Sequence, residues 1–130
     1  MSVPAHVVIE GSNPATTDAQ RSALEAAGFS VTVCPGPDAE RRRTCALVID
    51  EPCPWVDAAD VVVHDLDPDK DAHRKVLRAL RRTHPEMPIV VEVPERTATR
   101  HASLLDGCHV IYPFGMDRLV DAVAAAVEAG

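Results

Sequence analysis

Short runs of β-branched and aliphatic residues recur along the chain, separated by segments in which apolar residues follow a helical spacing. Within the runs there is no polar alternation, which is typical of parallel strands covered by helices on both faces. The runs are residues 7–9, 31–33, 61–63, 89–91 and 110–112. This alternation predicts an α/β fold with a doubly wound, five-stranded parallel sheet.

The segments between and after the runs predict the helices. We expect the first helix to begin near Thr16 or Thr17 as its N-cap and to end before Gly28, a residue suited to a left-handed C-terminal position. Further helices are predicted over residues 70–83, 98–105 and 116–129. The segment 70–83 has the clearest apolar stripe, with its basic residues mostly off that stripe.

One segment, residues 34–60, breaks the alternation. It is about ten residues longer than one helix and two short loops require. It contains four of the eleven prolines, three of the four cysteines and the only Trp. Asp38 could cap a helix over residues 39–49, or residues 46–49 could form a short edge strand, and periodicity does not decide between them. We treat the segment as an irregular Cys/Pro-rich insertion between strands two and three.

Composition limits the functions open to the chain. Its 130 residues fit one domain over residues 1–130. Twenty acidic residues against 13 Lys and Arg give a net charge of −7, so we expect no nucleic-acid partner. No apolar run approaches the roughly 18 to 20 residues that a membrane helix needs, so we expect no membrane partner. The first residues do not form a basic and then apolar leader, which favours a cytoplasmic location.

Three stretches carry a family resemblance: residues 60–66 (Asp-Val-Val-Val-His-Asp-Leu), 84–91 (His-Pro-Glu-Met-Pro-Ile-Val-Val) and 107–114 (Gly-Cys-His-Val-Ile-Tyr-Pro-Phe). Together with the five strands and their crossovers, they make the chain resemble the receiver domains of bacterial response regulators. The resemblance covers nearly the whole chain, and it implies the flavodoxin-like strand order 2-1-3-4-5.

The resemblance also implies a site. In that family a histidine kinase phosphorylates an Asp at the end of strand three, and Asp65 takes this position. Where the family has two metal-binding carboxylates, the chain has Glu10 followed by a glycine. The phosphate-binding hydroxyl after strand four is replaced by Val93. The Lys that precedes a Pro-Phe pair after strand five is replaced by Tyr112, before Pro113.

Acidic residues are expected to lie close together at the carboxyl ends of the strands, around Asp65. Neighbouring carboxylates raise one another's pKa and disfavour a further phosphoryl group. Two interpretations of these acidic residues remain open. They could be solvated loop residues, or Glu10, Asp65 and the backbone near Asp67 could form a magnesium site. His64 precedes Asp65 on a strand, so its side chain should point away from the pocket. The acidic pocket around Asp65 is predicted to contain Glu10, Asp67 and Glu92.

Three cysteines of the insertion, Cys34, Cys45 and Cys53, follow the spacing Cys-x10-Cys-x7-Cys. They predict either a zinc, iron–sulfur or redox site or three thiols that pack as small apolar groups. Structural zinc sites usually include a close Cys-x2-4-Cys pair, and this chain has none. A fourth ligand would have to come from elsewhere, because Cys108 is expected at the opposite end of the sheet, where we assign it to packing.

Two functional hypotheses follow. The first is a stand-alone, atypical receiver-like signalling domain, a pseudo-receiver, that is not an enzyme and acts through a protein partner in bacterial regulation rather than through aspartyl phosphorylation. A homodimer through helix four, strand five and helix five is part of this hypothesis. The alternative is a thiol-based metal, iron–sulfur or redox sensor that uses the cysteines of the insertion.

Overall fold

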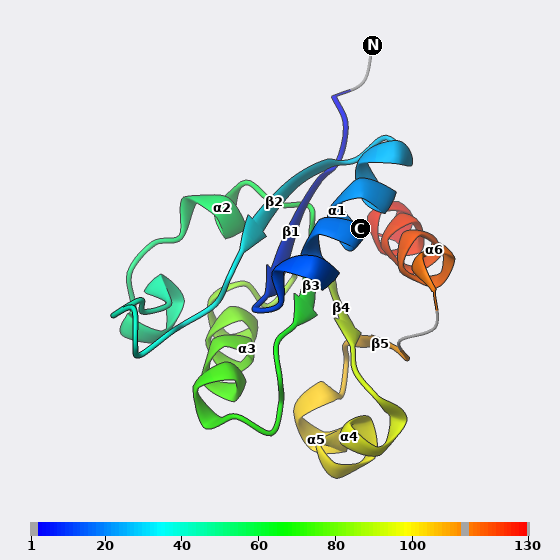
Figure 1. Ribbon diagram of the computed structural model, residues 1–130. Coiled ribbons are helices and arrows are strands. Elements are labelled where there is room, and N and C mark those ends of the chain that lie inside the picture. Colours follow the sequence, from blue (N-terminus) through cyan, green and yellow to red (C-terminus); the bar gives the residue numbers. More distant parts are fainter. Residues whose placement is uncertain (1–2, 113–114, 130) are drawn as a thin grey trace.

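The structure, a computed structural model, describes residues 3–112 and 115–129. A five-stranded parallel sheet lies between two layers of helices (Figure 1). The sheet order is β2-β1-β3-β4-β5, so the predicted fold class is confirmed. The last strand stops just before Tyr112. The strands are β1 (His6–Gly11), β2 (Ser30–Cys34), β3 (Val61–Asp65), β4 (Ile89–Glu92) and β5 (His109–Ile111).

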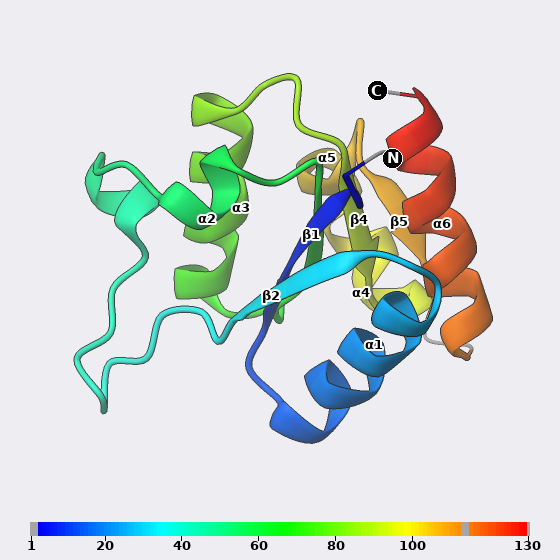
Figure 2. The same ribbon diagram turned by 90° about the horizontal axis from the view of Figure 1, so that it is seen from above.

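Two long helices cover one face of the sheet, and a third long helix covers the other together with several short ones. The first face carries α1 (Pro14–Ala26) and α6 (Met116–Ala129). The second carries α3 (Asp71–Thr83) with the short helices η1 (Ala46–Ile49), α2 (Pro54–Asp57), α4 (Glu95–Arg100) and α5 (Ala102–Leu105). Figure 2 shows α1 and α6 on one side of the strands and α2 and α3 on the other.

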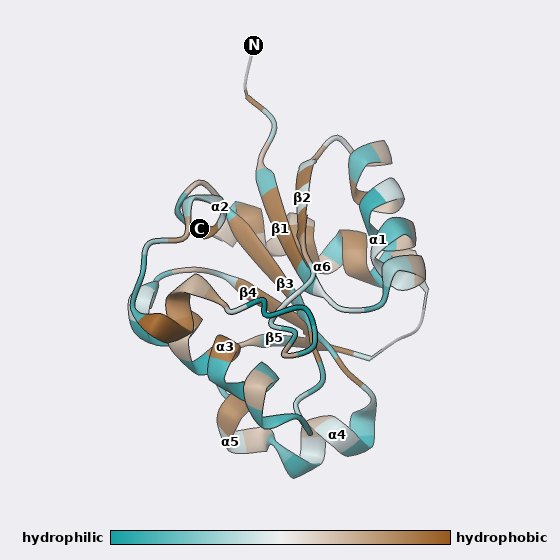
Figure 3. Ribbon diagram, turned by 60° about the vertical axis from the view of Figure 1, so that its left-hand side comes forward, coloured by the Kyte–Doolittle hydropathy of each residue, from teal (hydrophilic) through white to brown (hydrophobic). Residues whose placement is uncertain are grey.

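Side chains alternate along each strand, because successive residues of a strand point to opposite faces. Val7 and Ile9 of β1 belong to the same apolar cluster as Leu24 of α1. Val8 belongs instead to the cluster that contains Leu77 of α3. Figure 3 shows β1 and β3 as apolar strands between the helical layers. This alternation also decides on which face each polar residue at the strand ends lies.

Two helix predictions need correction. The first helix begins at Pro14, and its N-cap is Asn13, three or four residues before the predicted caps, because the Oδ1 atom of Asn13 accepts hydrogen bonds from the backbone N–H groups of Ala15 and Thr16. Pro14 suits the first helical position, where no N–H is needed. Gly28 has a positive φ of 99°, as expected after the helix end. The predicted helix 98–105 is two short helices, α4 and α5, separated by His101.

The segment 34–60 follows neither of the predicted alternatives. Asp38 caps a turn rather than a helix, since its Oδ1 atom accepts from the N–H groups of Glu40 and Arg41, at 3.0 and 3.4 Å. The backbones of Asp38 and Arg43 then pair in an isolated antiparallel bridge. Residues 46–49 form the 3-10 helix η1 and not an edge strand, because this turn buries Leu47 against the core.

Candidate functional site at the carboxyl edge of the sheet

Two carboxylates meet on the α1 face, at the carboxyl ends of β3 and β4. Asp65 and Glu92 are the last residues of these strands. Gln20 of α1 lies between them, and its Nε2 atom donates to Asp65 Oδ2 at 3.2 Å and to Glu92 Oε2 at 2.7 Å. Gln20 is fully buried. A neutral amide thus holds together two acidic groups that would otherwise repel each other.

The position next to Asp65 on β1 is closed by packing. Gly11 pairs with Asp65 in the register of β1 and β3. A Cβ atom on Gly11 would meet the methyl group of Thr17, which is itself buried at the start of α1. A second carboxylate at this position therefore has no room unless Thr17 moves, and Gly11 supplies no side-chain ligand.

The pKa of Asp65 reflects these surroundings. Burial, and after it the neighbouring charge of Glu92, raises the pKa of Asp65 from the ordinary value of 3.8 to about 6. The hydrogen bond from Gln20 and the ring of His64 act against this rise. Desolvation thus outweighs the amide donor, and the pKa of Asp65 lies well above its ordinary value.

The prediction that Glu10 shares the pocket of Asp65 is wrong. Glu10 pairs in register with His64, one residue before Asp65, so both side chains point to the α3 face. Glu10 Oε1 lies 2.9 Å from His64 Nδ1, and both residues are buried. The prediction that His64 points away from the pocket is confirmed. Because side chains alternate along β1 as well, Glu10 also points away from the pocket.

The carboxylates of the loop after β3 form hydrogen bonds and ion pairs that hold the loop in place. Asp67 is exposed, and its Oδ1 atom accepts from the N–H of Asp69 at 2.9 Å. Asp69 in turn pairs with Arg100 and His101, at 2.7 and 2.8 Å, and so ties this loop to the α4–α5 junction. The predicted acidic pocket is therefore reduced to Asp65 and Glu92, with Asp67 capping a turn beside it.

A magnesium ion does not fit the groups at this edge. Magnesium takes near-octahedral oxygen ligands, and a signalling Asp would need further carboxylates beside it. Here Gly11 has no side-chain oxygen, Glu10 lies on the other face, and the Gln20 amide N–H points at both remaining carboxylates. Within residues 3–112 and 115–129, no group of three His, Cys, Asp or Glu residues is arranged to hold a metal ion.

No protein-family model and no curated protein matches the sequence. Solved structures do match it over nearly its whole length. A response regulator receiver protein from Sinorhizobium medicae is 22% identical, with a TM-score of 0.70 over 97% of this chain and 96% of that one. A receiver domain protein from Clostridium thermocellum is 17% identical, with a TM-score of 0.71 over 96% and 95%. The chain has the receiver fold.

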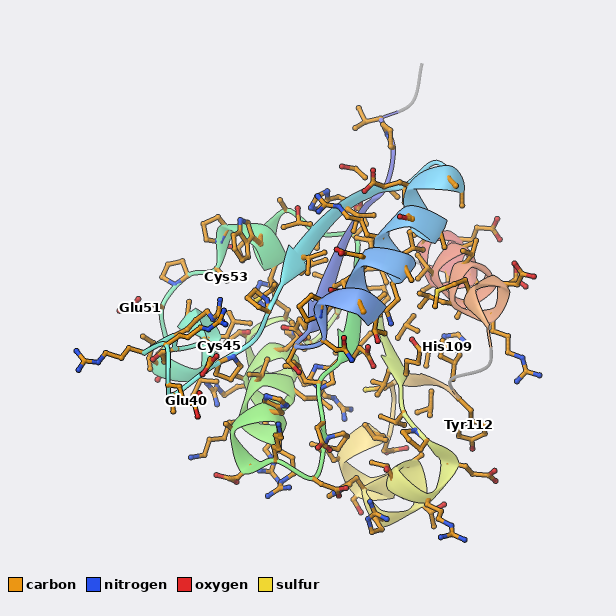
Figure 4. All side chains as sticks on the ribbon, viewed as in Figure 1. Glu40, Cys45, Glu51, Cys53, His109 and Tyr112 are labelled. Carbon is orange, nitrogen blue, oxygen red and sulfur yellow. The ribbon has the colours of Figure 1, made fainter. Side chains whose placement is uncertain are left out.

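The predicted switch positions follow the last two strands: Val93 comes after β4, and Tyr112 and Pro113 come after β5. Val93 is buried in the α3-side cluster, and its N–H donates to the carbonyl of Ile111 at 3.1 Å. Tyr112, which follows β5, is 39% exposed (Figure 4). Pro113 lies outside the described residues. This chain thus has an apolar side chain within the core at position 93 and an exposed phenol at position 112.

The three cysteines of the insertion line one cavity on the α3 face, although the chain separates them widely. Cys34 ends β2, Cys45 precedes η1 and Cys53 precedes α2. Figure 4 labels Cys45 and Cys53 on the segment beside β2. All are free thiols. Burial is the main cause that raises the pKa of Cys34 and of Cys45, which favours the neutral thiol over the thiolate. Cys108 packs against the α3-side cluster, away from this cavity.

Sequence reasoning missed Thr17 and Gln20, the two residues that close the Asp65 site. Both are polar residues on the buried stripe of α1, three positions apart and in line with Leu24. Polar residues at core positions of an amphipathic helix are the signal that could have identified them. Separately, none of the described helices is long and apolar enough to cross a membrane.

Proposed function

We propose that the protein is a receiver-like signalling domain that acts through contacts with a protein partner and without aspartyl phosphorylation. The observation that carries the proposal is the double hydrogen bond from Gln20 to Asp65 and Glu92. Phosphoryl transfer to an Asp depends on cations that neutralise the developing charge. In this site a second carboxylate and a neutral amide lie beside the acceptor instead.

The switch positions support the same proposal. A hydroxyl after β4 could bind an incoming phosphoryl group, but the side chain of Val93 has no hydroxyl and is buried in the core. Tyr112 replaces the expected Lys with an exposed phenol. Since Val93 has no hydroxyl and Tyr112 has no amine, the surface of α4, β5 and α6 is proposed to bind its partner, or a second copy of the chain, in one constant conformation.

Treatment with acetyl phosphate and magnesium tests the proposal. Intact-mass measurement should show no gain of about 80 Da, the mass of one phosphoryl group, on the wild-type chain. A receiver domain with the full set of phosphorylation residues, treated in the same tube, controls for the reagent. Stoichiometric modification that disappears in Asp65→Asn would overturn the proposal.

The second candidate function is the thiol-based sensor, favoured by the position of Cys34, Cys45 and Cys53 around one cavity. We rank the sensor function lower because the pKa values of Cys34 and Cys45 are raised, whereas metals and oxidants react with the thiolate. Anaerobic purification followed by metal analysis and a visible spectrum separates the two functions. Bound zinc or iron in amounts equal to the protein would favour the sensor.

A further inference from the structure

The segment 34–60 leaves a cavity of about 370 Å³ between itself and the α3 face of the sheet. A regular crossover would place a full helix here, whereas this crossover forms the short helices η1 and α2. The walls are largely apolar and include Val8 of β1, Leu47 of η1 and Val76 of α3. A cavity of this size is within the range of small-molecule sites.

One hydrogen-bond donor beside this cavity has no acceptor. Arg43 lines the cavity, and its Nε atom is buried without a hydrogen-bond partner among the residues that the structure describes. A guanidinium keeps its protons at any physiological pH, so this N–H is always a donor. Leaving a buried donor unpaired is costly, and an oxygen atom that accepts from it removes the cost. The unpaired N–H therefore indicates that a ligand of this cavity carries an acceptor oxygen.

The backbone of Arg43 is held more tightly than its side chain. Its backbone N–H and carbonyl pair with those of Asp38, at 2.8 and 2.9 Å. Its Nη2 atom lies 3.7 Å from Asp38 Oδ2, which is longer than a hydrogen bond, and the side chain as a whole is 39% exposed. A small rotation of the side chain therefore directs the Nε–H at an oxygen in the cavity while the backbone stays in place.

The lining contains one charged group of each sign, Arg43 and Glu10. Glu10 is already paired with His64, whose Nδ1 atom lies 2.9 Å from Glu10 Oε1. A ligand ion of either sign would leave water for largely apolar walls and would meet a like charge there as well as an opposite one. A neutral ligand avoids both costs, so the acceptor that fits this lining is a carbonyl oxygen rather than a carboxylate.

We propose that this cavity binds a small neutral molecule with an apolar body and one carbonyl oxygen, such as an aromatic ketone, that accepts from Arg43 Nε. The apolar body would fill the space that the short helices leave. The thiols of Cys34, Cys45 and Cys53 form part of the wall around it, where neutral thiols act as small apolar groups. This site is independent of the Asp65 edge and of the proposed function.

Two probes of nearly equal shape test the role of the carbonyl: acetophenone and α-methylstyrene, in which a CH₂ group replaces the oxygen. Trp55, the only Trp of the chain, lines the cavity and is half exposed, so its indole N–H signal in a ¹H–¹⁵N spectrum reports occupancy. Both probes should shift this signal in a saturable way. Arg43→Met should weaken acetophenone binding about tenfold and leave α-methylstyrene binding nearly unchanged, because acetophenone alone accepts a hydrogen bond.

The control for Arg43→Met is Arg41→Met, since Arg41 is highly exposed and lies outside the lining. This variant should bind both probes as the wild-type chain does. Ala46→Phe fills the cavity from η1 and should abolish binding of both, whereas Ala58→Phe at the exposed end of α2 should not. Benzoate and benzamidine, at concentrations at which acetophenone saturates the site, should not shift the Trp55 signal. Circular dichroism checks that each variant folds.

Four results would overturn the inference: no saturable shift with acetophenone, equal loss of both probes in Arg43→Met, binding of either ion as tightly as acetophenone, or full acetophenone binding by folded Ala46→Phe. If Arg43→Met does not fold, Arg43→Lys replaces it, because Lys keeps the charge but lacks the Nε–H. If Ala46→Phe does not fold, nuclear Overhauser contacts between bound acetophenone and the Leu47 methyl groups locate the ligand, and their absence at saturation would overturn the inference.

Discussion

Two carboxylates near the ends of neighbouring strands, Asp65 and Glu10, lie on opposite faces of the sheet in different surroundings. On the α1 face, a full helix places Thr17 and Gln20 directly over Asp65, and these side chains fill the site. On the α3 face, Glu10 is 3% exposed and lines the cavity that the irregular segment 34–60 leaves. The comparison shows that the covering element, rather than the strand residue, decides whether a polar group at the sheet edge packs against side chains or lines a cavity.

Replacement of Gln20 should have the largest effect on this comparison. Gln20→Leu removes both hydrogen bonds and leaves Asp65 and Glu92 facing each other without a donor. We expect a loss of about 3 kcal/mol in the free energy of unfolding at pH 7, because hydrogen bonds to charged groups contribute most. Urea unfolding measures it. Adding Glu92→Gln to the variant should recover about half of the loss, and a wild-type-like Gln20→Leu would show that the amide bridge is not stabilising.

Packing at Gly11 should have the next largest effect. Gly11→Ala brings a Cβ atom against the methyl group of Thr17 and should cost about 2 kcal/mol, as overpacking of a core does. Thr17→Ser removes that methyl group, so the double variant should be more stable than the sum of the two single changes predicts. Additive losses in urea unfolding would mean that the two positions do not touch.

The titration of Asp65 should be visible in the pH dependence of stability. Its folded pKa, about 6, lies above the ordinary 3.8, so the folded state binds the proton more tightly. Stability should therefore fall as the pH rises from about 4 to about 6 and then level off. Asp65→Asn should remove this fall and be more stable than wild type at pH 7, by about 1 kcal/mol after allowance for solvent screening. Identical pH profiles for the two proteins would argue against a raised pKa.

The smallest effect is expected on the reactivity of the cavity thiols. Since the pKa values of Cys34 and Cys45 are raised, little thiolate is present near neutral pH. Alkylation by iodoacetamide, followed by mass spectrometry, should be about tenfold slower at these cysteines in the folded chain than in urea. Faster reaction in the folded chain would instead indicate activated thiolates and favour the sensor function.

The strands could be predicted from sequence because each contains a run of at least two consecutive β-branched residues. The segment 34–60 could not, since Asp38 can cap a turn as well as a helix and four apolar residues at 46–49 suit several conformations. Within the site, Asp65 and Glu92 followed from strand ends. Gln20 did not, because its role depends on how α1 packs across β3 and β4, a tertiary contact that no local pattern contains.

A magnesium titration followed through the side-chain amide signals of Gln20 tests most directly whether the Asp65 site is closed to a cation. Because the amide N–H already binds both carboxylates, we predict that these signals do not move in a saturable way as magnesium is added. The backbone amide signals of the residues next to Gln20 should also stay unchanged. Saturable shifts of the Gln20 amide, lost in Asp65→Asn, would show that a cation displaces it and would contradict the account.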